Sequence, residues 1–532
     1  MKYLESKTLN RIHLLILALI AGTGAIFILV CTKKYGTAFS ADSVYYMAAA
    51  HNLLAGQGFR MPNGEVLASW PPLYPSLLAA LKFCRLDYIV STRCISAATF
   101  GITGFLAGLW VLKYSQRLFL AVLCMVAILC SKPLTWVFCY AWSETIFLAL
   151  LMMFFLILPS VIKRPTIKWA LVLALITTAV SLTRYVGGVL VVLVVLLFLV
   201  NRKHTFPKRV GFAAFFGIVS ALPLALWLLR NWVLTGTLAG PRLAAETTLF
   251  SNIGLAGKLI ASWFLPPQIA KSVPGWIFFC LFCVFIAWML ITAIRGSQKS
   301  NRYWLDSPEV IPALFLVVYT GAILATVTST LVEELNDRYL APSYLAAVLL
   351  FLVNLKNIFS LDIKLIQAKK EFFGKLIRTG ILGGIALGIW FGTGANYVLT
   401  RAERMVKYGA GGRNSVRWQQ SETVGWLKSH PLSGDVFSNK IFTVFFFTRR
   451  TCKNIPIKPT RKSGSSPALR RLSQRRLAEF KRAVKSKERA YLVWFVAKPR
   501  PYAYDLEELQ ELCQMTVLQK FPDGAIIALN PK

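Results

Sequence analysis

Charged residues are scarce in this chain, and acidic ones are the scarcest. Only 16% of its 532 residues are charged, and 23 Asp and Glu stand against 60 Lys and Arg. Hydrophobic residues make up 56%, and several apolar runs approach the roughly 20 residues that a helix needs to cross a bilayer. Inside a bilayer, backbone polar groups must be satisfied within the helix itself. The composition therefore predicts a polytopic helical membrane protein.

Patterns that hold metals and nucleotides are also missing. The C-terminal part has no glycine-rich nucleotide-binding loop. Cys280 and Cys283 form a CxxC, but it lies inside an apolar run, which argues against a redox or zinc role. We therefore expect no cofactor and no metal site. The four histidines form no cluster in the sequence: His13, His51, His204 and His430.

A cleavable signal peptide is absent as well. The basic residues Lys2, Lys7 and Arg11 precede the apolar run 12–31, but no small-residue cleavage site follows this run. We expect an uncleaved first membrane helix that passes from the cytoplasm to the outside.

Basic residues gather in the short loops between apolar runs, which marks these loops as cytoplasmic. The rest of the positive excess lies beyond Arg401, in a long tail. Nucleic acid is one explanation of the formal charge of +37. Anionic lipid head groups and acidic glycolipid substrates fit a membrane protein better. We expect membrane lipids as partners, and no nucleic acid.

The apolar runs predict about 11 membrane helices, with the tail outside the cytoplasm. Residues 169–200 are too long for one pass, because a helix of this length would reach about 48 Å against a hydrocarbon core of about 30 Å. We expect two short passes that turn at 183–188. This turn places Arg184 at the outer surface, where a charge avoids the bilayer centre. The expected domains are a membrane domain (1–399, with an outer loop at 32–90) and a basic extracytoplasmic domain (400–532).

The outer loop holds a lone acid, Asp42, with no basic residue beside it. Residues 43–55 read as a helix lying on the membrane, with Asp42 at its N-cap. Tyr45 and Tyr46 follow, and a stiff Trp-Pro-Pro-Leu-Tyr-Pro turn occupies 70–75. Asp42 is then either a simple helix cap or the reactive acid of an enzyme at the outer mouth of the membrane domain.

Two more charged positions lie at outer helix ends. Glu144 opens a membrane helix, where the positive end of the helix dipole tolerates a carboxylate; the alternative is a role in a site. Arg338, next to Asp337, lies at the start of another helix, where its charge opposes the dipole. It needs a compensating anion, which neighbouring acids or a phosphate would supply.

The tail 400–532 alternates strand-like and helical patterns, which suggests a small α/β domain. Cys452 and Cys513 both lie in it, and a disulfide between them is open if the tail is outside the cytoplasm. Helices are expected at 421–429 and 506–513, strands at 441–448 and 490–496, a strand pair at 516–529, and a basic linker and helix at 461–487.

The order of these motifs resembles that of the GT-C glycosyltransferases, multi-pass enzymes that take sugars from polyprenyl-phosphate carriers. The resemblance is to its bacterial members, which include the branch related to the protein O-mannosyltransferases and the aminoarabinose transferases of lipid A. The segments that carry the resemblance are 42–46, 52–59, 70–75, 143–144, 183–185, 337–342, 426–428 and 437–439.

The resemblance implies an inverting transfer from a polyprenyl-phosphate-linked sugar to a lipid, glycan or protein acceptor, at the outer face of a bacterial inner (plasma) membrane. Asp42 corresponds to the family's base, and Arg338 to the cation that faces the leaving phosphate, with Arg184 as a second candidate. Ser43 stands where many relatives carry a second acid, which weakens any case for a metal. The implied substrate-binding residues are Tyr45, Tyr46, Glu144, Arg184, Asp337, Arg338 and Tyr339.

Two other classes of protein compete with this interpretation. A transporter or flippase of lipid-linked glycans usually shows paired repeats with helices broken at the membrane midplane. Here the polar residues lie at outer helix ends beside one large loop, which favours an enzyme. A non-catalytic scaffold that displays the basic tail would leave Asp42 and Arg338 without a purpose.

Overall fold

The computed structural model describes residues 10–532, apart from short stretches at 243–244, 246, 300–303, 331–332, 367–369, 459–466, 487 and 497–501. The chain divides into two compact units. The first, called the membrane unit below, comprises Met1–Cys31, Arg93–Trp227 and Ala244–Arg404. The second, called the loop–tail unit, comprises Thr32–Thr92, Leu228–Leu243 and Met405–Lys532.

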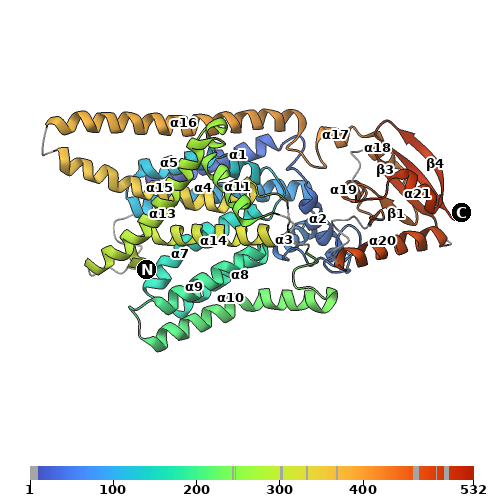
Figure 1. Cartoon of the computed structure of the whole chain (residues 1–532), viewed down its shortest axis with the longest axis horizontal. Coiled ribbons are helices and arrows are strands. Elements are labelled where there is room, and N and C mark those ends of the chain that lie inside the picture. Colours follow the sequence, from blue (N-terminus) through green and yellow to red (C-terminus); the bar gives the residue numbers. More distant parts are fainter. Residues whose placement is uncertain are drawn as a thin grey trace. The chain divides into compact units, whose positions relative to one another are not determined.

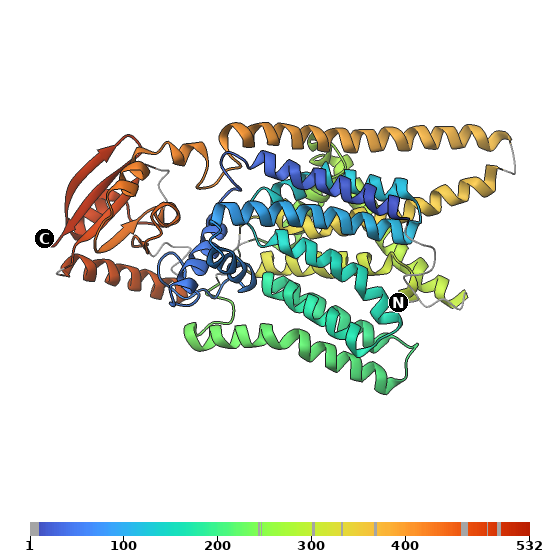
Figure 2. The same ribbon diagram turned by 180° about the vertical axis from the view of Figure 1, so that it is seen from behind.

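Long helices that run side by side dominate the membrane unit (Figure 1 and Figure 2). Two short 3-10 turns, η1 (Tyr185–Gly187) and η2 (Trp304–Asp306), connect some of them. The helices that lie wholly or mostly in this unit are α1 (Arg11–Cys31), α4 (Tyr88–Ser115), α5 (Leu118–Leu129), α6 (Lys132–Phe138), α7 (Glu144–Lys163), α8 (Ile167–Thr183), α9 (Gly188–Val200), α10 (Phe206–Thr235), α11 (Leu249–Ala261), α12 (Pro267–Ala270), α13 (Val273–Lys299), α14 (Val310–Ser329), α15 (Asp337–Ile366) and α16 (Lys370–Tyr408).

Seven of the described helices are long and apolar enough to cross a membrane, or eight if α5 and α6, which meet at 61°, form one bent span. Two shorter apolar helices, Ile167–Thr183 and Tyr185–Val200, replace the single long run at 169–200, as predicted. The last expected span, 376–397, lies within α16. The prediction of a polytopic helical membrane protein is therefore confirmed.

The break between α8 and α9 depends on a close approach of the backbone. Arg184 ends α8 in an extended conformation, with φ −149° and ψ 131°, and η1 follows it directly. A Cβ on Gly187 would meet the carbonyl oxygen of Val180 at 2.7 Å. Only a glycine fits this approach without a shift of the backbone, and the tight return fixes the position of Arg184.

A five-stranded sheet forms the centre of the tail part of the loop–tail unit (Figure 1). The strand order is β2-β1-β3-β5-β4, in which β1 runs parallel to β2 and β3, whereas β5 runs antiparallel to β3 and β4. The elements are α2 (Ala41–Leu54), α3 (Leu73–Phe83), α17 (Val416–Gln419), α18 (Glu422–Ser429), β1 (Asp435–Ser438), α19 (Ile441–Thr448), β2 (Lys453–Asn454), α20 (Pro467–Lys485), β3 (Ala490–Phe495), α21 (Leu506–Leu512), β4 (Gln514–Phe521) and β5 (Gly524–Asn530).

Both faces of this sheet are covered by helices. On one face, α18 and α19 pack against Val493 and Ile526. On the other, α20 and α21 pack against Leu492 and Ile527. Successive residues of a strand point to opposite faces, so the apolar runs of β3 and β5 fill two hydrophobic cores. The predicted small α/β domain is confirmed, with helices and strands at nearly all the expected positions.

The strand expected at 441–448 is wrong, because this segment forms the helix α19. Its sequence, Ile-Phe-Thr-Val-Phe-Phe-Phe-Thr, is apolar throughout, and such a run does not distinguish a buried strand from a buried helix. Ile441 and Val444 pack on the sheet, whereas Phe446 packs on Phe39 of the outer loop. The topology also requires a crossover here, since β1 and β2 are parallel neighbours.

The outer loop packs on the tail within the loop–tail unit. The Phe39 and Phe446 rings lie 4.9 Å apart, and the Cys452 N–H donates to the Pro62 carbonyl at 2.9 Å. The Arg413 N–H donates to the Phe39 carbonyl at 3.0 Å. Loop residues 32–90 therefore belong to one compact body with the tail, while the domain boundary expected at 399/400 stays a prediction.

Cys452 and Cys513 are both free and buried. Cys452 lies in the core beneath α18 and α19, and Cys513 lies in the core on the opposite face of the sheet. The disulfide that the sequence left open is therefore absent. Residues 461–466 of the expected basic linker lie outside the described part of the chain, and α20 accounts for most of the remainder.

Candidate active site

The acid of the outer loop lies in the first turn of α2, not at its cap. Ser40 is the N-cap: its side chain accepts from the Ser43 N–H, and the Ser43 side chain accepts from the Ser40 N–H. This capping box satisfies the first turn without Asp42. The helix expected at 43–55 therefore begins two residues earlier, at Ala41, and the prediction of Asp42 as its N-cap is wrong. Its carboxylate lies half-buried at the positive end of the helix dipole.

Aromatic side chains surround the part of α2 that follows Asp42. The Tyr45 ring lies 4.3 Å from the Trp70 ring and meets Phe442 of α19 edge-on at 4.9 Å. Tyr46 is buried and meets Tyr74 at 5.0 Å. Burial, with the Asp42 charge nearby, raises the pKa of Tyr45 to about 12. Tyr45 is therefore a neutral phenol near physiological pH, able to donate or accept a hydrogen bond.

A buried ion cluster occupies the membrane unit. Glu144, the first residue of α7, is fully buried and pairs with both Arg184 and Arg338. Arg184 comes from the break between α8 and α9, and Arg338 from the first turn of α15. The structure thus brings Arg184 and Arg338 into direct contact with Glu144, although the three predicted residues lie far apart in the sequence. It also supplies the anion that Arg338 requires at a helix N-terminus.

Asp337 extends the cluster. Its carboxylate accepts from the Lys132 ammonium at 2.8 Å and from the Trp263 indole N–H at 3.1 Å. Only 3% of Asp337 is exposed. The Tyr339 carbonyl accepts from the Tyr319 hydroxyl at 3.2 Å, which ties the start of α15 to α14.

The cluster as a whole is electropositive. Three cations, Arg184, Arg338 and Lys132, accompany the two carboxylates of Glu144 and Asp337, which leaves an excess of one positive charge. The Arg338 guanidinium also lies 4.1 Å from the centre of the Trp142 ring. Fixed guanidinium groups in a site of low exposure are suited to bind phosphate oxygens.

Sequence reasoning missed three members of this cluster: Lys132, Trp142 and Trp263. The signal for Lys132 was its place at the end of an apolar run, directly before a proline in the first turn of a helix. Nothing in the sequence pairs it with Asp337, which is about 200 positions away. The two tryptophans are indistinguishable by pattern from interfacial anchors.

The eight predicted site residues fall into two groups. Glu144, Arg184, Asp337, Arg338 and Tyr339 belong to the membrane unit, whereas Asp42, Tyr45 and Tyr46 belong to the loop–tail unit. Within the described residues, no group of three His, Cys, Asp or Glu side chains is placed to hold a metal ion.

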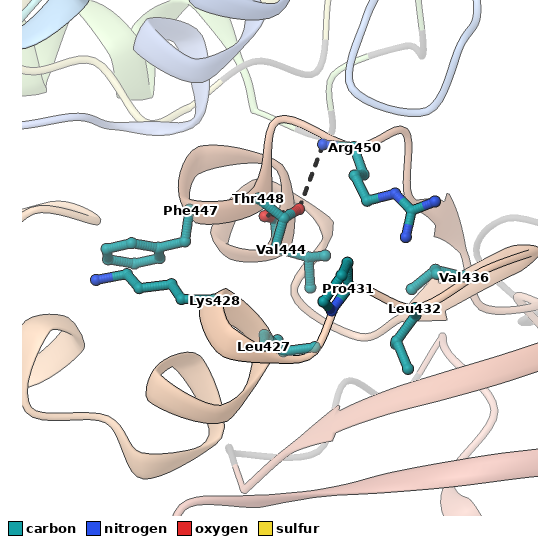
Figure 3. Close-up of a pocket in the computed structure, with 9 residues that line it drawn as sticks. All are labelled: Leu427, Lys428, Pro431, Leu432, Val436, Val444, Phe447, Thr448 and Arg450. Carbon is teal, nitrogen blue, oxygen red and sulfur yellow. Dashed lines mark hydrogen bonds between the residues drawn. The ribbon is translucent and has the colours of Figure 1, made fainter.

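A small apolar cavity lies between α18 and α19 (Figure 3). Its volume is about 170 Å³. Lys428 and Arg450 lie at its edge, with the Lys428 ammonium 4.7 Å from the Phe447 ring and the Arg450 N–H donating to Thr448. Its lining is otherwise mostly aliphatic: Leu427, Pro431, Leu432, Val436 and Val444. None of the predicted site residues lines it.

No protein family and no curated protein matches this chain. Among solved structures, ArnT from Cupriavidus metallidurans bound to undecaprenyl phosphate is similar over 96% of this chain and 97% of that one, with a TM-score of 0.59 and 12% identity. The apo state of ArnT gives a TM-score of 0.58 at 11% identity, with the same coverage. Likeness at such identity establishes a fold, because one fold serves many activities. The chain has the fold of ArnT, which confirms the predicted GT-C-like membrane fold with a small C-terminal α/β part.

Proposed function

We propose that this chain is a membrane glycosyltransferase that moves a sugar from a polyprenyl-phosphate carrier to an acceptor outside the cytoplasm. The observation that carries the proposal is the buried cluster around Glu144, with its excess of one positive charge. A lipid phosphate bound there would meet guanidinium groups that carboxylates already hold in place. The ArnT structure with bound undecaprenyl phosphate supports the same class of carrier.

In the proposed reaction, an acceptor hydroxyl oxygen attacks the anomeric carbon of the carrier-linked sugar. The new C–O bond forms as the bond from that carbon to the phosphate oxygen breaks on the opposite face, so the configuration inverts. Asp42 takes the hydroxyl proton as general base. The carrier leaves as a lipid phosphate, and Arg338 and Arg184 stabilise the charge that develops on it.

The other predicted residues have supporting roles in this proposal. Glu144 and Asp337 position the cations, since each contacts at least one of them directly. Tyr45 and Tyr339 are assigned to contacts with the sugar, because a phenol combines an apolar face with a hydrogen-bonding hydroxyl. Tyr46 is assigned to the same binding site as a support for Tyr45, because it is buried against Tyr74. The acceptor is a lipid, a glycan or a protein. We place the enzyme in a bacterial inner membrane with this site facing outward, as the distribution of basic loops supports.

The test uses the full chain in proteoliposomes, supplied with a panel of polyprenyl-phosphate sugars and extracts that contain acceptors. We expect at least one donor to release the free carrier phosphate and to transfer its sugar, with inverted configuration at the anomeric carbon. A panel without turnover, together with movement of the lipid-linked sugar across the bilayer, would contradict the transferase and favour a flippase.

A further inference from the structure

A second cavity in the loop–tail unit is more polar than the apolar one and has more cations in its wall. It has a volume of about 310 Å³, within the range of ligand pockets, roughly 300–1,000 Å³. It lies where the segment before α18 meets the start of α19. The residues that line it are Gly412, Arg413, Ser415, Arg417, Trp418, Asn439, Lys440, Ile441, Phe442, Thr443 and Asn454.

Three of these lining residues are cations: Arg413, Arg417 and Lys440. None of the described lining residues is acidic. Three cations around one cavity without a carboxylate in its wall create a local positive potential, which a bound anion would neutralise. The helix α19 also begins here, and the positive end of its dipole adds to this potential.

The wall of this cavity is held in place by the fold. The Asn439 side chain donates to the Phe495 carbonyl at 2.8 Å and accepts from the Phe495 N–H at 3.0 Å, which fixes the turn before α19 to the end of β3. The Arg413 guanidinium donates to the Phe39 carbonyl at 3.3 Å. The Lys440 N–H donates to Ser438 at 3.0 Å. A fixed wall lowers the entropy that a ligand must offset on binding.

Aromatic rings accompany two of the cations. The Arg413 guanidinium lies 5.2 Å from the centre of the Phe442 ring, and the Arg417 guanidinium lies 5.5 Å from that of Trp418. Rings offer an apolar surface to the C–H face of a sugar, and the cations and hydroxyls beside them suit its charged and polar groups. Both rings also pack on the core of the unit, which holds them in place at the cavity.

We propose that this cavity binds a phosphorylated sugar, with Arg413, Arg417 and Lys440 on the phosphate and with Phe442 and Trp418 against the ring. The proposal concerns the loop–tail unit alone and does not depend on the transferase activity proposed above. The apolar cavity of the same unit provides a comparison, since Lys428 and Arg450 lie at its edge, but Phe447 is the one aromatic residue among its lining residues and most of the rest are aliphatic.

The test measures binding of glucose 6-phosphate, inorganic phosphate and glucose to the full chain in detergent by calorimetry. Salt is kept at about 150 mM to screen diffuse attraction. We expect glucose 6-phosphate to bind more tightly than inorganic phosphate, and glucose not to bind measurably. The double variant Arg417→Gln/Lys440→Gln should bind glucose 6-phosphate about tenfold more weakly or worse, because charge-assisted hydrogen bonds are lost.

The control is Lys428→Gln/Arg450→Gln, which removes the same charge from the same unit at the apolar cavity. It should keep wild-type affinity. An equal loss of affinity for glucose 6-phosphate in both double variants would mean that the effect comes from the general charge of the unit. This result would overturn the proposed site. Equal binding of glucose 6-phosphate and inorganic phosphate would overturn the role of the rings, and no binding of either would overturn the proposal. Thermal unfolding of both variants shows whether they remain folded.

Discussion

Glu144 is the residue on which the ion cluster depends most. Its carboxylate is fully buried and contacts two guanidinium groups at once. Replacement by Gln keeps the shape but removes the charge that both arginines face. Breaking a buried pair from one side costs about 3–5 kcal/mol, because a buried charge loses its compensation. We therefore expect Glu144→Gln to lower the thermal unfolding temperature of the detergent-solubilised protein markedly.

The matched control for this change is Glu479→Gln. Glu479 pairs with Lys453 at 3.5 Å, and its side chain is 40% exposed. Pairs in such positions contribute about 0–1 kcal/mol, so its unfolding temperature should stay close to that of the wild type. Equal shifts in the two variants would mean that the Glu144 cluster is solvated rather than buried.

Asp523 predicts a pH dependence of stability in the loop–tail unit. It lies in the turn between β4 and β5 and accepts hydrogen bonds from Ser421 and Thr423 of the α18 N-terminus. Although burial acts in the opposite direction, these hydrogen bonds hold the pKa of Asp523 below its ordinary value. A depressed pKa means that the carboxylate stabilises the fold above its unfolded-state pKa, near 3.9. This contribution is lost as the pH falls through the lower, folded-state value.

The unfolding temperatures of wild type and Asp523→Asn, measured from pH 7 to pH 3, test this expectation. The advantage of the wild type should be constant down to about pH 4 and should shrink below it. A difference in unfolding temperature that does not change with pH would contradict the prediction that the charge of Asp523 stabilises the fold. The effect of the substitution would then come from the shape of the side chain alone.

At the scale of elements, the break between α8 and α9 gives a clean comparison of two neighbouring glycines. A Cβ on Gly187 would meet the Val180 carbonyl oxygen at 2.7 Å, whereas one on Gly188 would meet only a Leu224 methyl at 3.6 Å. Gly187→Ala must shift backbone, and overpacking of this kind costs about 1–3 kcal/mol. We expect Gly187→Ala to unfold at a lower temperature than the wild type, and Gly188→Ala to match it. Equal unfolding temperatures of the two variants would contradict the close approach of Gly187 to the Val180 carbonyl.

The elements also show where sequence reasoning succeeds. The length of the run 169–200 predicts a break, because a membrane has a fixed thickness and basic residues mark both ends of the run. The apolar run at 490–496 and the strand pair around the turn at 522–524 likewise predict β3, β4 and β5. The α19 error has a physical reason, since a segment buried on all sides shows no period. Helix starts are also hard to place: Ser40 and Asp42 are both good caps, and only the side-chain geometry separates them.

At the scale of the whole molecule, the order of motifs along the chain predicted the fold that the likeness to ArnT confirms. The candidate site was predictable only in part. Charges at helix ends stand out against an apolar background, and so Glu144, Arg184 and Arg338 could be selected. Their mutual contacts could not, because Arg184 lies 40 and Arg338 lies 194 positions beyond Glu144 (184 − 144 = 40; 338 − 144 = 194), and pairing across such distances leaves no local pattern. The packing of the outer loop on the tail likewise leaves no local pattern in the sequence.

The central claim is carrier-dependent sugar transfer with Asp42 as the base. The most direct test compares wild type and Asp42→Asn in proteoliposomes with the donor that supports turnover, and measures the release of free carrier phosphate. Because Ser40 and Ser43 cap α2 without Asp42, the variant should fold, with an unfolding temperature close to that of the wild type. We predict turnover by the wild type and a loss of about 100-fold or more in the variant, as expected for a missing general base. Turnover by a folded Asp42→Asn at the wild-type rate would contradict the account.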